Sequence, residues 1–111
     1  MPEYNPNVVD YLSATIAGTS GSILTLADGG AVTIPNSARS YKGVLYTAAI
    51  RARGDGTAAT ASAGIQIQTG TTIYLSHSEI TNMQFIREGA TSGLIIGHFY
   101  DVPVSVLIQC T

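Results

Sequence analysis

Residues 43–57 of this chain read GVLYTAAIRARGDGT, and their pattern decides the fold class. Side chains of an extended chain alternate between two faces. The even-numbered residues from Val44 to Ala52 therefore fall on one side, and the odd-numbered residues from Leu45 to Arg53 fall on the other. This alternation is typical of a strand with one buried face. Two arginines come just before the GDG sequence, which places fixed positive charge at the rim of a sheet.

Other short apolar segments are separated by turn signals about every 8 to 12 residues, as in all-β domains. The sequence Asp28-Gly29-Gly30 predicts a hairpin, because these residues tolerate the positive φ of tight turns. No sustained helical period is present. Further strands are predicted at residues 12–17, 23–26, 31–34, 65–67, 73–75, 83–87, 94–100 and 104–108, with 94–100 as an interior strand.

The chain is predicted to be all-β: a single β-sandwich over residues 11–111, with a jelly-roll-like arrangement. Residues 1–10 are predicted to form an extended N-terminal arm, because their two prolines favour extended backbone over helix. Segments of this kind order when they bind a partner. Tyr4, Val8 and Val9 are the side chains that the arm offers for docking.

The composition favours a protein whose surface is covered by neighbours. Hydrophobic residues make up 45% of the 111 residues and charged residues only 11%, well below the roughly 25% of an ordinary soluble domain. A surface with so little mixed charge resists association poorly. We therefore expect an assembly subunit that forms a homo-oligomer.

The charges argue against two other classes of partner. The net charge is -2 and the five basic residues are scattered, whereas binding to a phosphate backbone needs clustered Lys or Arg. The start of the sequence has no basic segment followed by an apolar one, and no run approaches about 18 apolar residues. Synthesis in the cytoplasm, with no nucleic-acid or membrane partner, is expected.

No pattern in the sequence indicates catalysis, a metal or a cofactor. His77 lies between two serines and before Glu79, but adjacent residues point in different directions and do not converge as a catalytic triad does. His98 lies in an apolar run, and two distant histidines with the single Cys110 have no metal-ligand spacing. We expect a protein that is not an enzyme. The six tyrosines leave open a glycan-binding surface, although tyrosine is equally frequent at subunit interfaces.

The GDG turn itself predicts a pinned loop. Asp55 is short enough to accept hydrogen bonds from its own turn, Gly56 supplies the turn conformation, and Thr57 follows it. Arg51 or Arg53 can donate to that carboxylate or to free carbonyl groups at the strand end. A contact of either arginine with a partner subunit is the alternative, and the two roles are compatible.

Residues 51–64 read RARGDGTAATASAG and resemble a motif of small β-sandwich virion proteins of tailed bacteriophages. In that family, a strand ends in Arg-x-Arg-x-Asp-Gly-Thr and a short loop with Thr or Ser leads to a glycine. Ala58-Ala59 stands where proline is common in the family. The likeness extends more loosely over residues 23–100.

The resemblance implies a capsid decoration or cement protein that stabilises the phage head by binding the major capsid protein lattice. It also implies location in the virion and a homotrimer, the state that fits three-fold positions of a capsid. The alternatives are another virion component, such as a head-completion, tail or fibre-associated protein, and a glycan-binding β-sandwich module.

Overall fold

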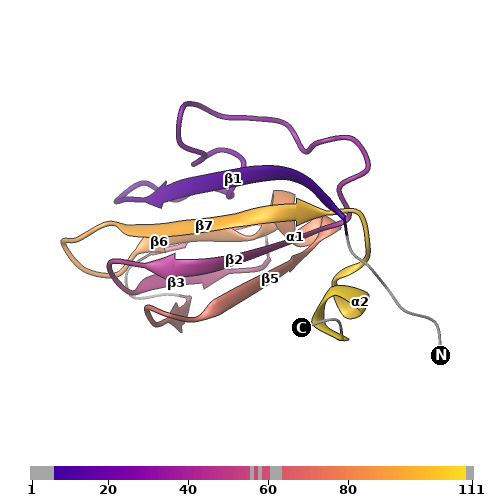
Figure 1. Ribbon diagram of the computed structural model, residues 1–111. Coiled ribbons are helices and arrows are strands. Elements are labelled where there is room, and N and C mark those ends of the chain that lie inside the picture. Colours follow the sequence, from indigo (N-terminus) through magenta and orange to yellow (C-terminus); the bar gives the residue numbers. More distant parts are fainter. Residues whose placement is uncertain (1–6, 56, 58, 61–63, 110–111) are drawn as a thin grey trace.

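The computed structural model describes residues 7–55, 57, 59–60 and 64–109 of the chain. In these residues the chain forms seven strands and two short helices (Figure 1). They are β1 (Val8–Ile16), β2 (Ser40–Tyr46), β3 (Ile50–Arg53), β4 (Ile65–Ile67), β5 (Thr72–Ser76), α1 (His77–Asn82), β6 (Gln84–Arg87), β7 (Gly93–Tyr100) and α2 (Val104–Gln109).

The strands form two antiparallel sheets, one of four strands in the order β1-β7-β2-β5 and one of three in the order β4-β3-β6. Their facing sides enclose one apolar core. The predicted all-β sandwich is confirmed, and β7 is an interior strand as expected, whereas this strand order does not establish a jelly roll. β1 begins at Val8, inside the predicted arm, and residues 1–6 lie outside the described part.

The predicted single strand over residues 43–53 is wrong, because the chain turns at Thr47 and passes from one sheet to the other. Thr47 has φ 75°, and the amide of Ala48 donates to the carbonyl oxygen of Tyr46 at 3.0 Å. This is a γ-turn with a positive central φ, which is rare for a β-branched residue. The Thr47 hydroxyl also donates to the Ser92 carbonyl at 2.7 Å, which fixes the corner to the loop before β7.

The turn also changes which residues are buried. In β2 the odd-numbered Tyr41 and Leu45 face the core, but in β3 the even-numbered Ile50 and Ala52 do. The alternation expected across the whole segment therefore holds for each strand separately. Strands that switch sheets at a bend are the usual way to build the corners of a sandwich.

A second corner follows β1. The amide of Arg87 donates to the Ala17 carbonyl at 2.9 Å, and Phe85 and Gly21 exchange two backbone hydrogen bonds of 2.9 and 3.2 Å. Residues 17–21 therefore lie along the free edge of β6, although β1 itself belongs to the other sheet. This is a second place where chain continuous with a strand of the larger sheet pairs with the smaller sheet.

Tyr41 lies at the centre of the core and is fully buried. Its ring meets the Phe99 ring edge to face, with centroids 5.2 Å apart. Its hydroxyl donates to the Leu12 carbonyl of β1 at 2.9 Å. A Cβ on Gly43 would lie 2.8 Å from the Tyr41 ring, so glycine makes room for it. Burial raises the pKa of the Tyr41 hydroxyl far above its ordinary value.

The strands predicted at residues 23–26 and 31–34, and the hairpin between them, are wrong. Ser22 begins a turn instead: its carbonyl accepts from the Leu26 amide at 2.9 Å and its hydroxyl accepts from the Thr25 amide at 3.2 Å. Serine side chains that bond nearby amides compete with a strand ladder in this way. Gly29 and Gly30 do have positive φ, as their sequence suggests.

The strand predicted at residues 104–108 is also wrong, because this segment forms α2. The Pro103 carbonyl accepts hydrogen bonds from the amides of Val106 and Leu107 at 3.0 and 3.1 Å. Val104 and Val106, two residues apart, would share one face of a strand, whereas Val104 and Leu107, three residues apart, share one face of a helix. The apolar pattern of this segment therefore fits both structures. Proline at the start of a helix costs no hydrogen bond, so it favours this outcome.

Candidate functional site

The side of the four-stranded sheet that faces away from the core carries four of the six tyrosines of the chain. In β7, Ile95 and Phe99 are buried in the core, and the residues between them point the other way. The strand registers place the outward-pointing residues of β1, β2 and β5 on the same side of the sheet as these residues of β7. We call this side the outer face. It consists of Tyr11, Ser13, Thr15, Lys42, Val44, Tyr46, Thr72, Tyr74, Leu94, Ile96, His98 and Tyr100.

None of the apolar members of the outer face belongs to the core or packs against it. Tyr11 is 56% exposed and Tyr46 is 47% exposed. The His98 ring lies between two tyrosine rings, with centroids 5.6 Å from Tyr11 and 6.4 Å from Tyr100. His98 is thus an outward-facing strand histidine. Tyrosine at such density is typical of surfaces that meet another molecule.

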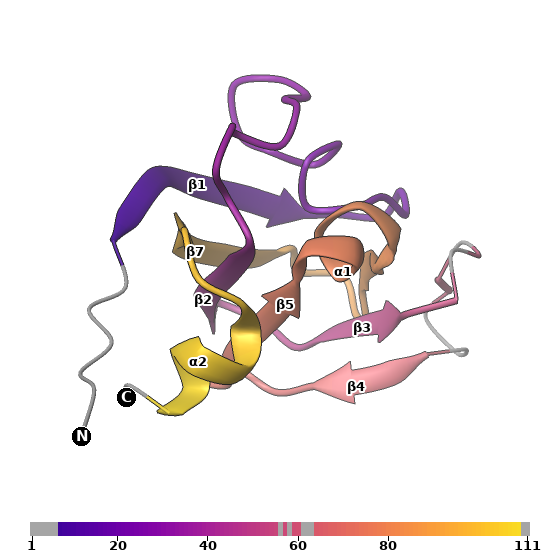
Figure 2. The same ribbon diagram turned by 90° about the vertical axis from the view of Figure 1, so that its right-hand side faces the viewer.

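The helix α2 lies on the outer side of the four-stranded sheet, opposite α1 and β3 (Figure 2). It contacts β5 and β2. Leu107 of α2 is 2% exposed although it does not belong to the main core. One end of the outer face is therefore covered by the chain's own helix, and the part around Tyr11 and Tyr46 stays open.

Asp28 lies at the β1 side of the outer face. Its carboxylate accepts hydrogen bonds from the hydroxyls of Ser13 and Thr15 at 2.8 and 2.7 Å. The bond from Thr15, followed by that from Ser13, lowers the pKa of Asp28 below its ordinary value. Asp28 is thus held as an anion at the rim, whereas Lys42 brings a positive charge to the interior strand β2, with its Nζ 5.8 Å from the centroid of the Tyr74 ring.

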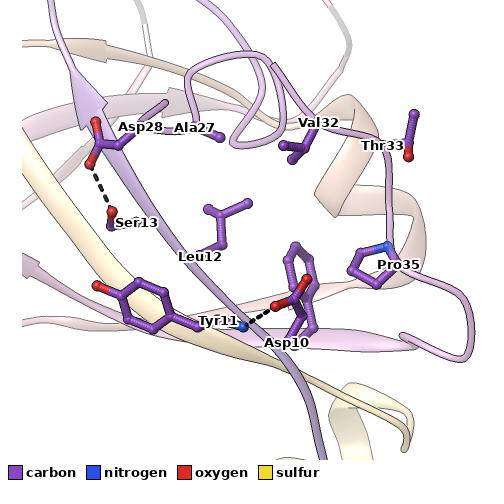
Figure 3. Close-up of a pocket in the computed structure, with 10 residues that line it drawn as sticks. Asp10, Tyr11, Leu12, Ser13, Ala27, Asp28, Val32, Thr33 and Pro35 are labelled. Atoms are coloured by element: carbon purple, nitrogen blue, oxygen red, sulfur yellow. Dashed lines mark hydrogen bonds between the residues drawn. The ribbon is translucent and has the colours of Figure 1, made fainter. Parts of the chain in front are cut away.

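A small cavity of about 150 Å³ lies between β1 and residues 27–35 (Figure 3). Leu12 and Val32 line it together with Asp10, whose carboxylate accepts from the Tyr11 amide at 2.8 Å. Pockets that hold small-molecule ligands usually measure about 300–1,000 Å³. This cavity is therefore smaller than a usual ligand pocket.

A second hollow of about 470 Å³ lies around residues 34–39 and His77. None of the residues that line it is a carboxylate. The described residues also contain no group of three or more His, Cys, Asp or Glu side chains that could hold a metal ion. Cys110 lies outside the described residues.

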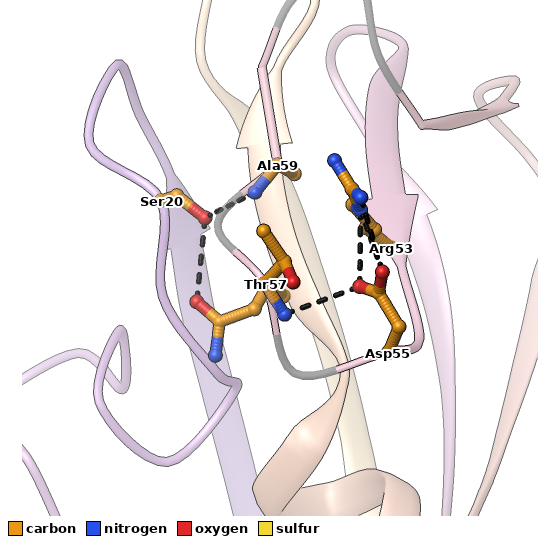
Figure 4. Close-up of polar contacts among 6 residues, drawn as sticks. Ser20, Arg53, Asp55, Thr57 and Ala59 are labelled. Atoms are coloured by element: carbon orange, nitrogen blue, oxygen red, sulfur yellow. Dashed lines mark hydrogen bonds and ion pairs between the residues drawn. The ribbon is translucent and has the colours of Figure 1, made fainter.

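The predicted pinned loop is present after β3 (Figure 4). The Arg53 Nε donates to both carboxylate oxygens of Asp55 at 3.0 and 3.1 Å, and Arg53 Nη2 adds a third bond of 3.0 Å. The Thr57 amide donates to Asp55 Oδ1 at 3.1 Å. Both contacts lower the pKa of the Asp55 carboxyl below its ordinary value. The hydrogen bond from Arg53 has the larger effect, and the one from the Thr57 amide has the smaller effect. Gly56 lies outside the described residues.

Arg51 makes different contacts. Its Nη1 donates to the Gly64 carbonyl at 3.0 Å, and its Nη2 donates to Glu88 Oε1 at 3.0 Å. The Gln66 side chain donates to both oxygens of Glu88 at 2.9 and 2.7 Å. Arg51 therefore ties β3 to β4 and to the residue after β6, and both arginines of the motif are engaged within the chain.

Ser20 attaches the far side of the same loop to the body of the domain. Its hydroxyl accepts from the Ala59 amide at 3.0 Å and donates to Gln84 Oε1 at 3.3 Å (Figure 4). Ala59 is buried. Ala59 therefore packs against the protein's own surface.

The residues predicted for docking at the N-terminus separate in the structure. Val8 is 54% exposed at the start of β1, whereas Val9 packs against the core. Tyr4 lies outside the described residues. Asn7 is fixed to Asp101, whose carboxylate accepts from its amide at 3.0 Å and from its side chain at 3.2 Å.

The outer face as a whole was missed by the sequence analysis. Four of the tyrosines belong to it, but the strand order that brings them together cannot be read from their spacing. One signal was available: β7 is apolar on both faces, as Leu94 and Ile96 show beside Ile95. Strands with this composition are usually covered on both sides.

Comparison with protein-family models, with curated proteins and with solved structures gives no match to this chain. Neither described helix is long and apolar enough to span a membrane.

Proposed function

We propose that this protein is a structural subunit of a tailed bacteriophage virion. As a decoration or cement protein, it binds the major capsid protein lattice from outside and stabilises the head. The family and the virion location follow from the resemblance of residues 51–64. The homotrimer expected at three-fold positions belongs to the same proposal.

The observation that carries the assembly role is the outer face. β7 has apolar residues on both faces, but the described part of the chain covers the second face only in part, with α2. Tyr11 and Tyr46 remain about half exposed on the open part. A tyrosine-rich surface with a single lysine, Lys42, supports a role in binding another protein.

Purified phage particles test the proposal directly. We expect the chain on the outside of the head, at a copy number fixed relative to the major capsid protein. Its location at a tail or head–tail joint would favour the alternative virion positions. Its absence from particles would remove the proposal.

Variants test the surface. Tyr11→Ser and Tyr46→Ser should weaken attachment to particles without loss of the fold, because both side chains are largely exposed. Val32→Ser is the matched control, since Val32 is 46% exposed but lies outside the outer face. Equal attachment of all three variants would show that the outer face is not the contact.

Glycan binding is the second candidate, and the same surface supports it. Tyr11 and Tyr46 present exposed rings on one side of a sheet, where sugar rings can stack on them. A glycan array and the two tyrosine variants separate the candidates. Glycan binding that is lost in both variants, with no attachment to particles, would favour the carbohydrate-binding module.

A further inference from the structure

The edges of the two sheets differ in how they are protected. An exposed edge strand is a template for pairing with another chain, so proteins usually block it with charge, proline or a covering segment. At the β1 edge, the Asp10 carboxylate accepts from the Tyr11 amide at 2.8 Å. The Asp28 amide donates to the Ser13 carbonyl at 2.8 Å on the same strand. β1 is therefore blocked.

The β6 edge is covered by the chain itself, and two short helices contact β5 at the remaining edge of the larger sheet. Residues 17–21 lie along β6 and hydrogen-bond to Phe85 and Arg87. β5 contacts both α1 and α2.

The β4 edge lacks such protection. In the described part of the chain, the backbone of Ile65–Ile67 hydrogen-bonds only in its ladder with β3. Ile65 is 75% exposed, the highest value among the exposed large hydrophobic residues. Residues 64–72 contain neither a charged residue nor a proline. An apolar edge without these blocking features favours strand pairing.

We propose that β4 pairs antiparallel with β4 of a second copy of this chain, about a two-fold axis at Gln66. This register places Ile65 of each copy opposite Ile67 of the other. The two residues lie on the same side of the sheet, so the most exposed isoleucine gains an apolar neighbour. The contact is self-complementary, as a two-fold interface must be.

Charge supports a second copy as the occupant. Like charges directly opposite one another would destabilise the pair, but β4 and its flanking residues are uncharged. The nearest carboxylate, Glu88, is already paired with Arg51 at 3.0 Å. The Arg51–Glu88 pairs of the two copies can therefore lie near the axis without an unpaired charge at the strand itself.

The contact is small, which sets its strength. Stable interfaces bury roughly 800 Å² per partner, and a three-residue strand with one exposed isoleucine offers much less. We therefore expect a weak dimer in solution that becomes significant where copies are held side by side. This inference goes beyond the proposed function, since it concerns only copies of this chain and does not require a phage particle.

Sedimentation velocity over a concentration series up to the millimolar range tests it. The wild type should show a concentration-dependent association beyond its basic unit, either the monomer or the proposed trimer, and Ile65→Lys should weaken it by roughly tenfold or more. Val32→Lys adds the same charge at another exposed apolar residue and should leave dimerisation unchanged. A wild type that does not associate beyond this unit, or that associates no better than Ile65→Lys, would overturn the proposal. Unfolding curves of both variants check that the fold is kept.

Cross-linking tests the register in a Cys110→Ser background. Gln66 of the two copies would have Cα atoms about 4.5–5.5 Å apart, within the reach of a disulfide. Gln66→Cys should therefore form a dimer when dioxygen, with a copper catalyst, takes one electron and one proton from each thiol. Gln68→Cys should not, because those positions would lie about 13 Å apart. Equal cross-linking of the two variants would exclude this register.

Attachment of Ile65→Lys to particles separates the two proposals. Lost dimerisation with normal attachment supports the β4 contact and leaves the particle role intact. If the wild type dimerises as expected but neither it nor Ile65→Lys attaches to particles, only the particle role is removed.

Discussion

Tyr41 connects three strands of the larger sheet through one side chain. It belongs to β2, its ring packs beneath β7 against Phe99, and its hydroxyl donates to Leu12 of β1. The side chain is fully buried, so no water replaces this hydrogen bond if it is lost.

Tyr41→Phe should lower the free energy of unfolding by about 1 kcal/mol at pH 7, the usual net value of a buried hydrogen bond. Chemical denaturation measures the loss. Tyr11→Phe is the control, because Tyr11 is 56% exposed and should change stability little. Equal losses in both variants would contradict the assigned role.

Tyr41→Phe should also change how the stability of the protein depends on pH in alkaline solution. The pKa of Tyr41 is raised by burial, so its stabilising contribution is complete below the ordinary tyrosine pKa near 10 and is lost as the pH rises above it. The wild type should therefore lose stability above about pH 10 more steeply than Tyr41→Phe. Parallel pH profiles would show that Tyr41 titrates normally.

Gly97 allows the closest approach between two strands. A Cβ at this position would overlap the Lys42 carbonyl and lie 2.5 Å from the Gly43 Cα. Gly97→Ala should cost about 3 kcal/mol or more, because the backbone of β2 has to move. Gly89→Ala, where nothing lies within 4 Å of the added atom, should stay within about 0.5 kcal/mol of the wild type in the same unfolding measurement.

Asp55 stabilises the loop after β3 from an exposed position, so its contribution to the stability of the domain is small. Its side chain is 54% exposed, and water can replace the acceptor that Arg53 and Thr57 would lose. Asp55→Ala should therefore lower stability only slightly, with Asp55→Asn closer to the wild type. Thermal unfolding compares the three proteins; a large loss in the alanine variant would mean that the loop supports the core.

At the scale of elements, the corner between β2 and β3 depends on Thr47. A β-branched residue with positive φ is held in a costly conformation, on the order of 1–3 kcal/mol. Its hydroxyl bond to the Ser92 carbonyl opposes that cost. The two effects predict different results for two substitutions.

Thr47→Val keeps the unfavourable φ and leaves the Ser92 carbonyl without this donor, so it should lose about 1 kcal/mol or more. Thr47→Gly also loses the hydroxyl but is relieved of the φ cost, so it should lie closer to the wild type. Denaturant unfolding of both variants decides. A glycine variant less stable than the valine variant would show that the positive φ is not a burden here.

The sequence predicted the elements whose pattern is local. The strands expected near residues 12–17, 65–67, 73–75, 83–87 and 94–100 are present. Failures occur where one residue overrides the pattern: Ser22 captures the amides of a turn, Thr47 bends a strand into the other sheet, and Pro103 begins a helix. Apolar alternation alone does not reveal these overrides.

One further element could have been predicted. Ser76 and Glu79 form a capping box, in which the Ser76 hydroxyl accepts from the Glu79 amide and the Glu79 carboxylate accepts from the Ser76 amide. The spacing S-x-x-E is a known start signal for a helix. The sequence analysis considered this stretch only for a catalytic triad and did not use its capping signal.

At the scale of the molecule, the outer face was beyond local reasoning. Tyr11 and Tyr46 are 35 residues apart in sequence, and only the order β1-β7-β2-β5 places them on one surface. The Arg53–Asp55 pair, in contrast, was predictable because its partners are two residues apart. Short-range polar contacts follow from spacing, whereas surfaces follow from strand pairing.

Acid should destabilise the whole domain through three exposed carboxylates. Hydrogen bonds lower the pKa values of Asp28, Asp55 and Asp101, with Thr15, Arg53 and Asn7 as the main respective donors. A lowered pKa means stability that is present above the ordinary value near 3.9 and lost as the pH falls through the folded value.

Thermal unfolding should therefore show a drop in Tm between about pH 5 and pH 3. Asp28→Asn should be less stable than the wild type at neutral pH and should have a smaller acid-induced drop. A variant with the wild-type pH profile would show that Asp28 contributes nothing to acid sensitivity.

The position of β7 between β1 and β2 has a consequence for synthesis on the ribosome. β1 and β2 emerge first, but the strand that belongs between them is translated last of the seven. The larger sheet has a vacant place until residues 93–100 have left the exit tunnel. Nascent chains with unpaired strands are prone to aggregate. A ribosome that stalls before Gly93 therefore holds a chain whose β1 has no neighbour from β7 and offers its backbone to other nascent chains.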